Sequence, residues 1–97
     1  MHFEWDEDKN ESNIEKHNID FEDAWEVFEG PLLVALDTRQ DYGEDRWIGI
    51  GFLGQRAVVV AYTYRGPDTA RIISMRKALH HERLQFEEFL RNRLGED

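Results

Sequence analysis

The chemically richest passage of the chain is "RGPDTARIISMRKALHHER", residues 65–83. It holds five of the twelve lysine and arginine residues, in a chain whose formal net charge is −9. Arginine suits phosphate binding because its planar guanidinium donates two parallel hydrogen bonds and stays charged. Arg65, Arg71 and Arg76 span an expected strand and the helix after it. They are therefore candidates for contacting phosphate groups, with ion pairs to the protein's own carboxylates as the alternative.

Lys9 and His17 form a second candidate pair. They lie eight residues apart, about two turns along one face of an expected helix. Histidine ordinarily changes charge near neutral pH, which suits it to proton transfer. A histidine at a helix end also hydrogen-bonds to the last carbonyls of the helix. Both roles stay open for His17, and Lys9 either holds a phosphate or pairs with its acidic neighbours.

Two further groups have both a binding and a structural interpretation. Arg46 follows Glu44 and Asp45, which favours an ordinary ion pair over a substrate contact. Tyr62 and Tyr64 share one face of an expected strand. Either ring can stack on an unpaired nucleic-acid base, and core packing is the alternative for Tyr62.

Glu82 and its histidine neighbours complete the polar groups of the basic passage. Glu82 can act as a base, although a salt bridge to an arginine is its commoner role. His80 and His81 are adjacent in sequence and therefore face different sides of a helix. They cannot readily chelate one metal ion, so we expect neither a metal site nor a cofactor.

The charge is unevenly divided along the chain. Residues 1–50 carry fifteen acidic and four basic residues, a net charge of −11, whereas residues 51–97 carry six acidic and eight basic residues, a net charge of +2. An acidic, solvated face that keeps the protein in solution is the simplest interpretation. Because phosphate contacts dominate nucleic-acid affinity, any nucleic-acid site must be local.

The N-terminal part is expected to form a short strand and two helices. "FEW" alternates in polarity as a short strand does. Asp6 can cap a first helix that runs to about His17, a polar helix with Ile14 as its main apolar contact. A second helix follows Asp20, its expected N-cap, and its apolar face consists of Phe21, Ala24, Trp25 and Phe28.

The rest of the chain predicts four strands and a final helix. The strand segments are short, β-branched and separated by turn signals: "LLVALD", "RWIGIGFL", "RAVVVAYTY" and "TARIIS". Gly54-Gln55 predicts a tight hairpin with glycine at positive φ. The final helix is expected from about Met75 to Leu94, with Ser74 as its N-cap and Gly95 just beyond its end. Arg76 would then stand at a helix N-terminus, whose free N–H groups favour an anion.

These elements predict a single α+β domain over residues 1–97. Two helices and a C-terminal helix would pack on a four-stranded antiparallel meander sheet in two layers, with a short N-terminal strand as an addition. The chain has no cysteine, and its longest apolar run, "AVVVAY", is far too short to span a membrane. The acidic N-terminus is unlike a signal peptide, so we expect a cytoplasmic protein.

Four blocks of sequence resemble the BrnT family of bacterial toxins. "FEWDEDKNESNIEKHNIDFEDA" fits the family's F-x-W-D-x-x-K-x-x-x-N-x-x-K-H-x-[IV]-x-F-x-x-A pattern. "RWIGIG", "VVVAYTYR" and "RIISMRKALHHER" are similar to later family blocks, and the four run in the family's order from residue 3 to 83. The chain departs from the pattern at Asn18, where relatives have glycine, at Met75 in place of alanine, and near Phe86, where a tyrosine is common in relatives.

The resemblance implies a RelE-like fold and a metal-independent ribonuclease that inhibits translation. It also implies neutralisation by a BrnA-like ribbon-helix-helix antitoxin, through which the complex binds operator DNA. RNA cleavage needs a base for the 2′-hydroxyl, an acid for the leaving 5′-oxygen, and cations for the phosphorane. The expected catalytic residues are Arg65, Arg71, Arg76, Lys9 and His17, and the expected substrate-binding residues are Arg46, Tyr62, Lys77 and Arg83. The alternative is a non-enzymatic module that binds only a partner.

Overall fold

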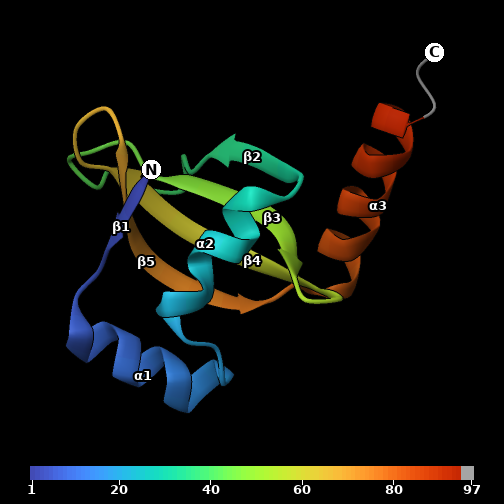
Figure 1. The fold of residues 1–97 in the computed structure, drawn as a ribbon. Helices are drawn as coiled ribbons and strands as arrows, with labels where there is room; N and C mark the ends of the chain where they lie inside the picture. Colours follow the sequence, from blue (N-terminus) through green and yellow to red (C-terminus); the bar gives the residue numbers. More distant parts are fainter. Residues whose placement is uncertain (95–97) are drawn as a thin grey trace.

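The computed structural model describes residues 1–94, and over that range it shows an α+β fold of three α-helices, one short 3₁₀ helix and five strands (Figure 1). The element order of the prediction is confirmed. The elements are β1 (His2–Glu4), α1 (Glu7–His17), η1 (Phe21–Asp23), α2 (Ala24–Glu29), β2 (Leu32–Leu36), β3 (Trp47–Leu53), β4 (Arg56–Tyr64), β5 (Thr69–Lys77) and α3 (His80–Leu94).

The five strands form one sheet in the order β1-β5-β4-β3-β2. Strands β2 to β5 make the predicted antiparallel meander. The short N-terminal strand is also present, and it adds to the sheet in parallel with β5, where Phe3 lies opposite Ala70. Gly54 turns the β3–β4 hairpin at φ 63°, as expected for this two-residue connection.

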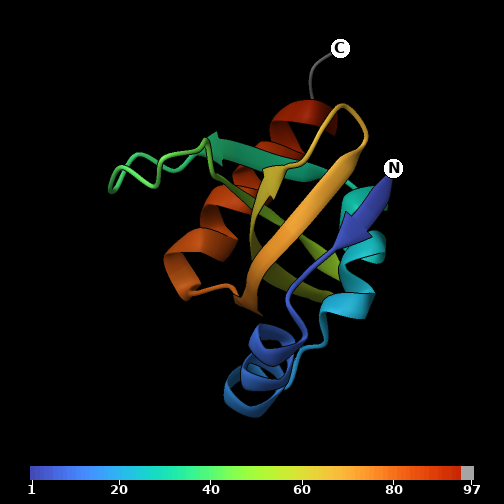
Figure 2. The same ribbon diagram turned by 90° about the vertical axis from the view of Figure 1, so that its left-hand side faces the viewer.

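Helices cover both faces of this sheet, so the expectation of two layers is wrong. Val58 and Val60 point toward α2, whereas Val59 between them packs with Phe86 of α3. Figure 2 shows the sheet with α3 on one side and α2 on the other. The continuous apolar run of β4 explains why both faces are covered. A strand with one solvated face would alternate between apolar and polar residues.

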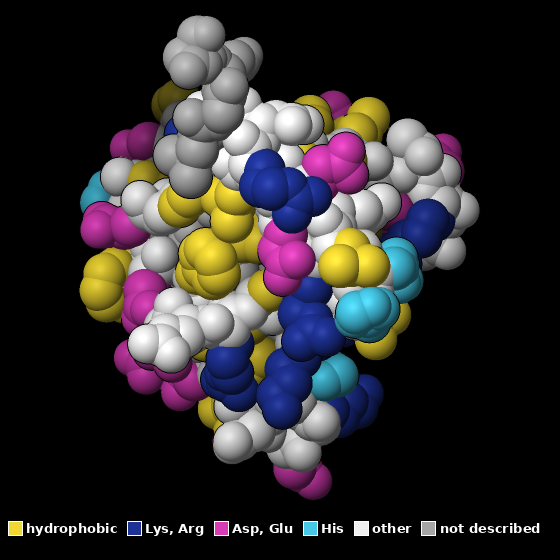
Figure 3. Space-filling view, turned by 90° about the vertical axis from the view of Figure 1, so that its right-hand side faces the viewer, with side chains coloured by type: hydrophobic (Ala, Val, Ile, Leu, Met, Phe, Trp, Pro, Cys, Tyr) yellow, Lys and Arg dark blue, Asp and Glu magenta, His cyan; other side chains and the backbone are white. Residues whose placement is uncertain are grey.

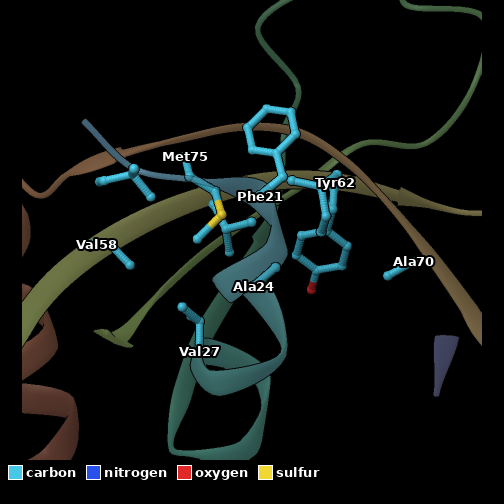
Figure 4. Close-up of a cluster of buried hydrophobic side chains, with 10 residues drawn as sticks. Phe21, Ala24, Val27, Val58, Tyr62, Ala70 and Met75 are labelled. Atoms are coloured by element: carbon cyan, nitrogen blue, oxygen red, sulfur yellow. The ribbon is translucent and has the colours of Figure 1, made fainter. Parts of the chain in front are cut away.

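The larger core lies between the sheet and the η1–α2 segment (Figure 4). Phe21, Ala24 and Val27 are each at most 1% exposed, and they pack against β4 and β5. Trp25, expected on the same helical face, is 52% exposed. The segment opens with a 3₁₀ turn of three residues per turn, which rotates the later residues relative to a continuous α-helix.

The junction between β5 and α3 differs from the prediction. The strand continues to Lys77, which lies opposite Val58 of β4, and α3 begins only at His80. Met75 is therefore a fully buried strand residue, and Ser74 is no helix cap. Ile73 is the extra residue of a β-bulge, because Ile72 pairs with Tyr62 while Ser74 pairs with Ala61. The expected stop at Gly95 lies outside the described residues.

Candidate active site

Helix α1 has defined ends, and both were predicted. The Asp6 carboxylate accepts hydrogen bonds from the backbone N–H groups of Asp8 and Lys9. Asn18 takes the left-handed conformation at φ 56°, and its N–H donates to the carbonyl of Ile14. Asparagine thus replaces glycine at this turn without losing it, because asparagine tolerates positive φ.

Asn13 joins this helix to the free edge of β5. Its Nδ2 donates to the Met75 carbonyl at 2.9 Å, and its Oδ1 accepts from the Met75 N–H at 3.2 Å, as a neighbouring strand would. Nδ2 also donates to the Ile19 carbonyl at 2.9 Å. A buried amide side chain, 7% exposed, therefore replaces the partner strand that β1 is too short to provide.

Asn10 fixes the loop that follows the helix. Its Oδ1 accepts from the Phe21 N–H at 2.8 Å, and its Nδ2 donates to Asp20 at 2.9 Å. Asp20 also caps η1, as predicted. Ile14, the expected apolar contact of α1, is 37% exposed. Helix α1 is therefore held to the molecule mainly by two buried asparagines.

This docking creates a hollow of about 210 Å³ between α1 and β5, which we call the α1–β5 hollow. Its helix side carries Lys9, Lys16 and His17, spaced so that they share a face with Asn13. Its strand side is Ser74 with the bulged Ile73, and Ser12 completes the lining. Lys9 and Lys16 form no ion pair with any described residue, 1–94.

The His17 ring makes no hydrogen bond within residues 1–94, since the helix end is satisfied by the Asn18 N–H instead. The capping alternative for this histidine therefore has no support. Lys9 likewise has no acidic partner at salt-bridge distance in that range. The structure brings together Lys9 and His17 as predicted, and it adds Lys16 and Ser74. The seven-residue spacing of the two lysines was the available signal for Lys16.

Arg71 lies beside the hollow on β5 but is held by a carboxylate. Its Nη1 is 2.8 Å from Oε2 of Glu4, which is its neighbour in the parallel register of β1 and β5. Both side chains are partly exposed, at 32% and 43%. An exposed pair of this kind is weak, so a phosphate group could compete for the guanidinium.

Arg76 lies on the other side of the hollow and is bound by Glu82 of α3. The two side chains form a bidentate pair, with N–O distances of 2.8 and 2.9 Å. Glu82 also accepts from the Leu79 N–H at 2.7 Å. The hydrogen bond from Arg76 lowers the pKa of Glu82 from 4.5 to about 2. The predicted salt bridge of Glu82 is confirmed, and this carboxylate occupies the place where we expected a bound anion.

Arg65 and Arg76 do not lie together at a helix start, because β5 extends to Lys77 and Arg76, expected at a helix N-terminus, stands within the strand. Arg65 lies past the far end of β4 and faces Glu44, with 3.7 Å between Nη2 and Oε1. Arg46 shares that glutamate at 3.4 Å, and its guanidinium lies 4.2 Å from the ring centroid of Tyr42. The ion-pair alternative therefore describes these two arginines.

Tyr62 cannot stack a base, because it is 2% exposed and belongs to the core. Its ring packs against Phe28 and Tyr64, with centroids 4.9 and 5.6 Å apart. Burial raises the pKa of its hydroxyl. Tyr64 is 46% exposed, so it is the ring of the two that remains open to solvent. Lys77 and Arg83 are exposed at the opposite end of the β4–β5 pair, away from Arg46 and Arg65.

Sequence reasoning also missed a polar cluster after β2. The Asp37 carboxylate, though only 9% exposed, accepts hydrogen bonds from Arg39 at 2.8 and 2.9 Å and from the Tyr42 hydroxyl at 2.9 Å. The hydrogen bonds from Arg39 hold the pKa of Asp37 well below its usual range. The short Asp37-Thr38-Arg39 spacing was the available signal for it. Asp37 and Arg39 border a hollow of about 670 Å³ between β2 and α3.

Within residues 1–94, no three histidine, aspartate or glutamate side chains are grouped so as to hold a metal ion. No helix in the same range is both long enough and apolar enough to cross a membrane.

Comparison with known proteins identifies the family. The model for "Ribonuclease toxin, BrnT, of type II toxin-antitoxin system" matches residues 5–82. The 1.1 Å crystal structure of the Brucella abortus ribonuclease toxin BrnT is 35% identical in sequence, and superposes with a TM-score of 0.66 over 82% of this chain and 99% of that one. No curated protein matches the chain. With its α+β fold and the ordered sequence blocks, the chain belongs to the BrnT family of ribonuclease toxins of type II toxin–antitoxin systems.

Proposed function

We propose that this chain is an endoribonuclease toxin that cleaves RNA without a metal ion, in the α1–β5 hollow. One observation carries the proposal. Lys9, Lys16 and His17 lie together there without an ion-pair partner among residues 1–94, in a chain of net charge −9. Their nitrogen groups, with the hydroxyls of Ser12 and Ser74, suit a phosphate group, whereas Mg²⁺ prefers carboxylate oxygens.

Histidine is the residue type suited to proton transfer near neutral pH, so we assign that role to His17. As a general base it takes the proton of the ribose 2′-hydroxyl, and the 2′-oxygen then forms a bond to phosphorus. The ammonium groups of Lys9 and Lys16 stabilise the negative phosphorane. The bond to the 5′-oxygen breaks, and that oxygen takes a proton from one of the cationic groups. The products are a 2′,3′-cyclic phosphate and a 5′-hydroxyl.

Arg71 and Arg76 bind the phosphates on either side of the cleaved one. They are five residues apart on β5, about 16 Å at the usual rise per residue, and Ile73 and Ser74 of the hollow lie between them. To bind RNA, each guanidinium exchanges its carboxylate, Glu4 or Glu82, for phosphate oxygens. Arg46 and Arg65 serve the Glu44 network instead.

The test is cleavage of a synthetic single-stranded RNA by the purified chain in EDTA. The wild type should release fragments that end in a cyclic phosphate. His17→Gln should cut the rate about 10²- to 10⁴-fold, the usual contribution of a general base. Arg91→Gln, which changes an exposed residue of α3, is the matched control and should cleave normally. Wild-type cleavage that needs Mg²⁺, or full activity of His17→Gln, would overturn this mechanism.

The family implies an antitoxin partner, and we propose a basic, ribbon-helix-helix protein of the BrnA type that brings the complex to operator DNA. The net charge of −11 on residues 1–50 supports a basic partner, because opposite charges accelerate association. The toxin would act on cytoplasmic RNA and so arrest translation. A purified antitoxin should associate more slowly as salt rises, and an association rate insensitive to salt would contradict the charge argument.

A second function, binding a partner without cleaving RNA, is favoured by the carboxylates that hold Arg65, Arg71 and Arg76. Inducible expression without antitoxin separates the two functions. The ribonuclease arrests growth and His17→Gln relieves the arrest at equal protein level. The binding module leaves growth unaffected in both cases.

A further inference from the structure

A second, strongly basic hollow lies at the end of β5 away from Arg71. Its volume is about 440 Å³, within the range of small-ligand pockets. Arg56 of β4, Lys77 of β5 and Arg83 of α3 line it together, and we call it the basic hollow. Figure 3 faces the side of the molecule that carries α3 and shows lysine and arginine side chains gathered below its centre.

The three cations of the basic hollow are exposed and uncompensated. None of the three forms a salt bridge with a described residue, whereas Arg71 and Arg76 of β5 both do. Arg83 contacts the Nδ1 atom of His80, at 3.2 Å. Among the described residues that line the hollow, Glu87 is the single acidic one. Three clustered cations repel one another in solution, and an anionic ligand relieves that repulsion.

An aromatic ring lies beside these cations. Phe52 lines the hollow and is 37% exposed, and Phe86 meets it edge to face with centroids 5.0 Å apart. Phe52 pairs with Ala57 across the hairpin. The hairpin turn is tied to α2 by a 2.6 Å hydrogen bond from the Gly54 N–H to Glu26. The ring is therefore held in place with part of its surface open.

We infer that the basic hollow binds one or two nucleotides of single-stranded RNA that flank the cleaved bond, with phosphates on Arg56, Lys77 and Arg83 and a base stacked on Phe52. Cations that follow the backbone and an aromatic ring that stacks a base are the two parts of a sequence-tolerant site for single strands. The inference rests on the proposed ribonuclease function and extends it, because Ser74 of the α1–β5 hollow and Lys77 of the basic hollow lie only three residues apart on β5.

The test is equilibrium binding of a fluorescent 2′-O-methyl oligonucleotide, which cannot be cleaved because its 2′-oxygen carries no proton. Affinity is measured over a series of salt concentrations. For single strands, the plot of log affinity against log salt has a negative slope. This slope becomes less steep by about 0.7 for each phosphate that the protein no longer neutralises. Arg56→Gln/Lys77→Gln/Arg83→Gln should therefore weaken binding and reduce the slope by about 2.

Three further variants test the separate parts of the site. Arg91→Gln/Arg93→Gln removes two charges from the end of α3, and it should change the affinity much less than Lys77→Gln/Arg83→Gln. Phe52→Leu keeps an apolar contact with Phe86 but removes the stacking ring, and it should weaken binding about fivefold or more, the lower end of the effect of one stacked base. Circular dichroism checks that each variant is folded.

Equal affinity and slope for the triple variant and the wild type would overturn the basic hollow as an RNA site. So would intact RNA binding by a triple variant that no longer binds the antitoxin, a result that assigns the hollow to a protein partner. Failure of the basic hollow as an RNA site can be distinguished from failure of the ribonuclease proposal. A chain that binds the oligonucleotide through these residues but cleaves no RNA retains this site and loses the catalytic one.

Discussion

Two regions along β5 present cations in opposite ways. The α1–β5 hollow carries Lys9, Lys16 and His17 on a helix that two neutral asparagines dock, and none of the three forms an ion pair within residues 1–94. Farther along the strand, past Ser74, Arg76 is saturated by Glu82. The difference shows that closeness to the hollow does not leave a cation unpaired. A helix docked by neutral amides places cations without pairing them to carboxylates.

Asn13→Leu should produce the largest loss of stability, because it removes the amide that docks α1. The variant leaves the Met75 N–H and two backbone carbonyls without partners in a buried place. At about 1–3 kcal/mol for an unsatisfied buried group, we expect a loss of about 3 kcal/mol or more in urea unfolding. Glu11→Gln, exposed on the same helix, is the control and should stay within about 0.5 kcal/mol. A urea unfolding midpoint of Asn13→Leu equal to that of the wild type would contradict the docking of α1 by Asn13.

Glu82→Gln should have a smaller effect and change two properties in opposite directions. Stability should fall by about 1–2 kcal/mol, because a charge-assisted bidentate pair becomes a neutral hydrogen bond. RNA affinity should rise, since Arg76 no longer needs to exchange a carboxylate for phosphate. Unfolding by urea and binding of an uncleavable oligonucleotide measure the two. Affinity that falls along with stability would mean that Glu82 positions Arg76 for RNA rather than competing with it.

The pH dependence of the same pair should be the smallest effect. The pKa of Glu82 is lowered to about 2 in the folded protein from an ordinary value of 4.5, so its contribution to stability is complete above about pH 4.5. It is lost as pH falls toward 2, where the carboxylate takes up a proton and releases Arg76. Glu82→Gln should lack this part of the acid dependence, measured as the difference in Tm between about pH 5 and about pH 3. Identical acid dependence in both proteins would contradict the assignment.

Local chemistry predicted the parts of this fold that depend on neighbouring residues. Asp6 as a helix cap, the end of the first helix near His17 and the hairpin at Gly54 each follow from the preferences of residues close together in sequence. The strand segments followed from β-branched runs between turn signals. These features need no knowledge of what packs above them.

The predictions that were wrong concern features set by contacts between residues distant in sequence. Met75 and Arg76 resemble a helix start in sequence, but pairing with β4 keeps them in a strand as far as Lys77. Asn10 and Asn13 look like surface residues of a polar helix, and only the partners at Phe21 and Met75 explain their burial. Which arginines bind carboxylates is likewise set by tertiary structure, so the sequence left that alternative open.

The central claim is that the unpaired cations of the α1–β5 hollow carry the chemistry, and that the arginines on Glu44 do not. Its most direct test compares two variants with equal charge changes, Lys9→Gln/Lys16→Gln and Arg46→Gln/Arg65→Gln, in cleavage of the same RNA in EDTA. We predict that the lysine variant loses at least about 10²-fold in rate while its Tm stays near that of the wild type, and that the arginine variant cleaves within about threefold of it. Normal cleavage by the lysine variant together with loss of activity in the arginine variant would contradict the claim.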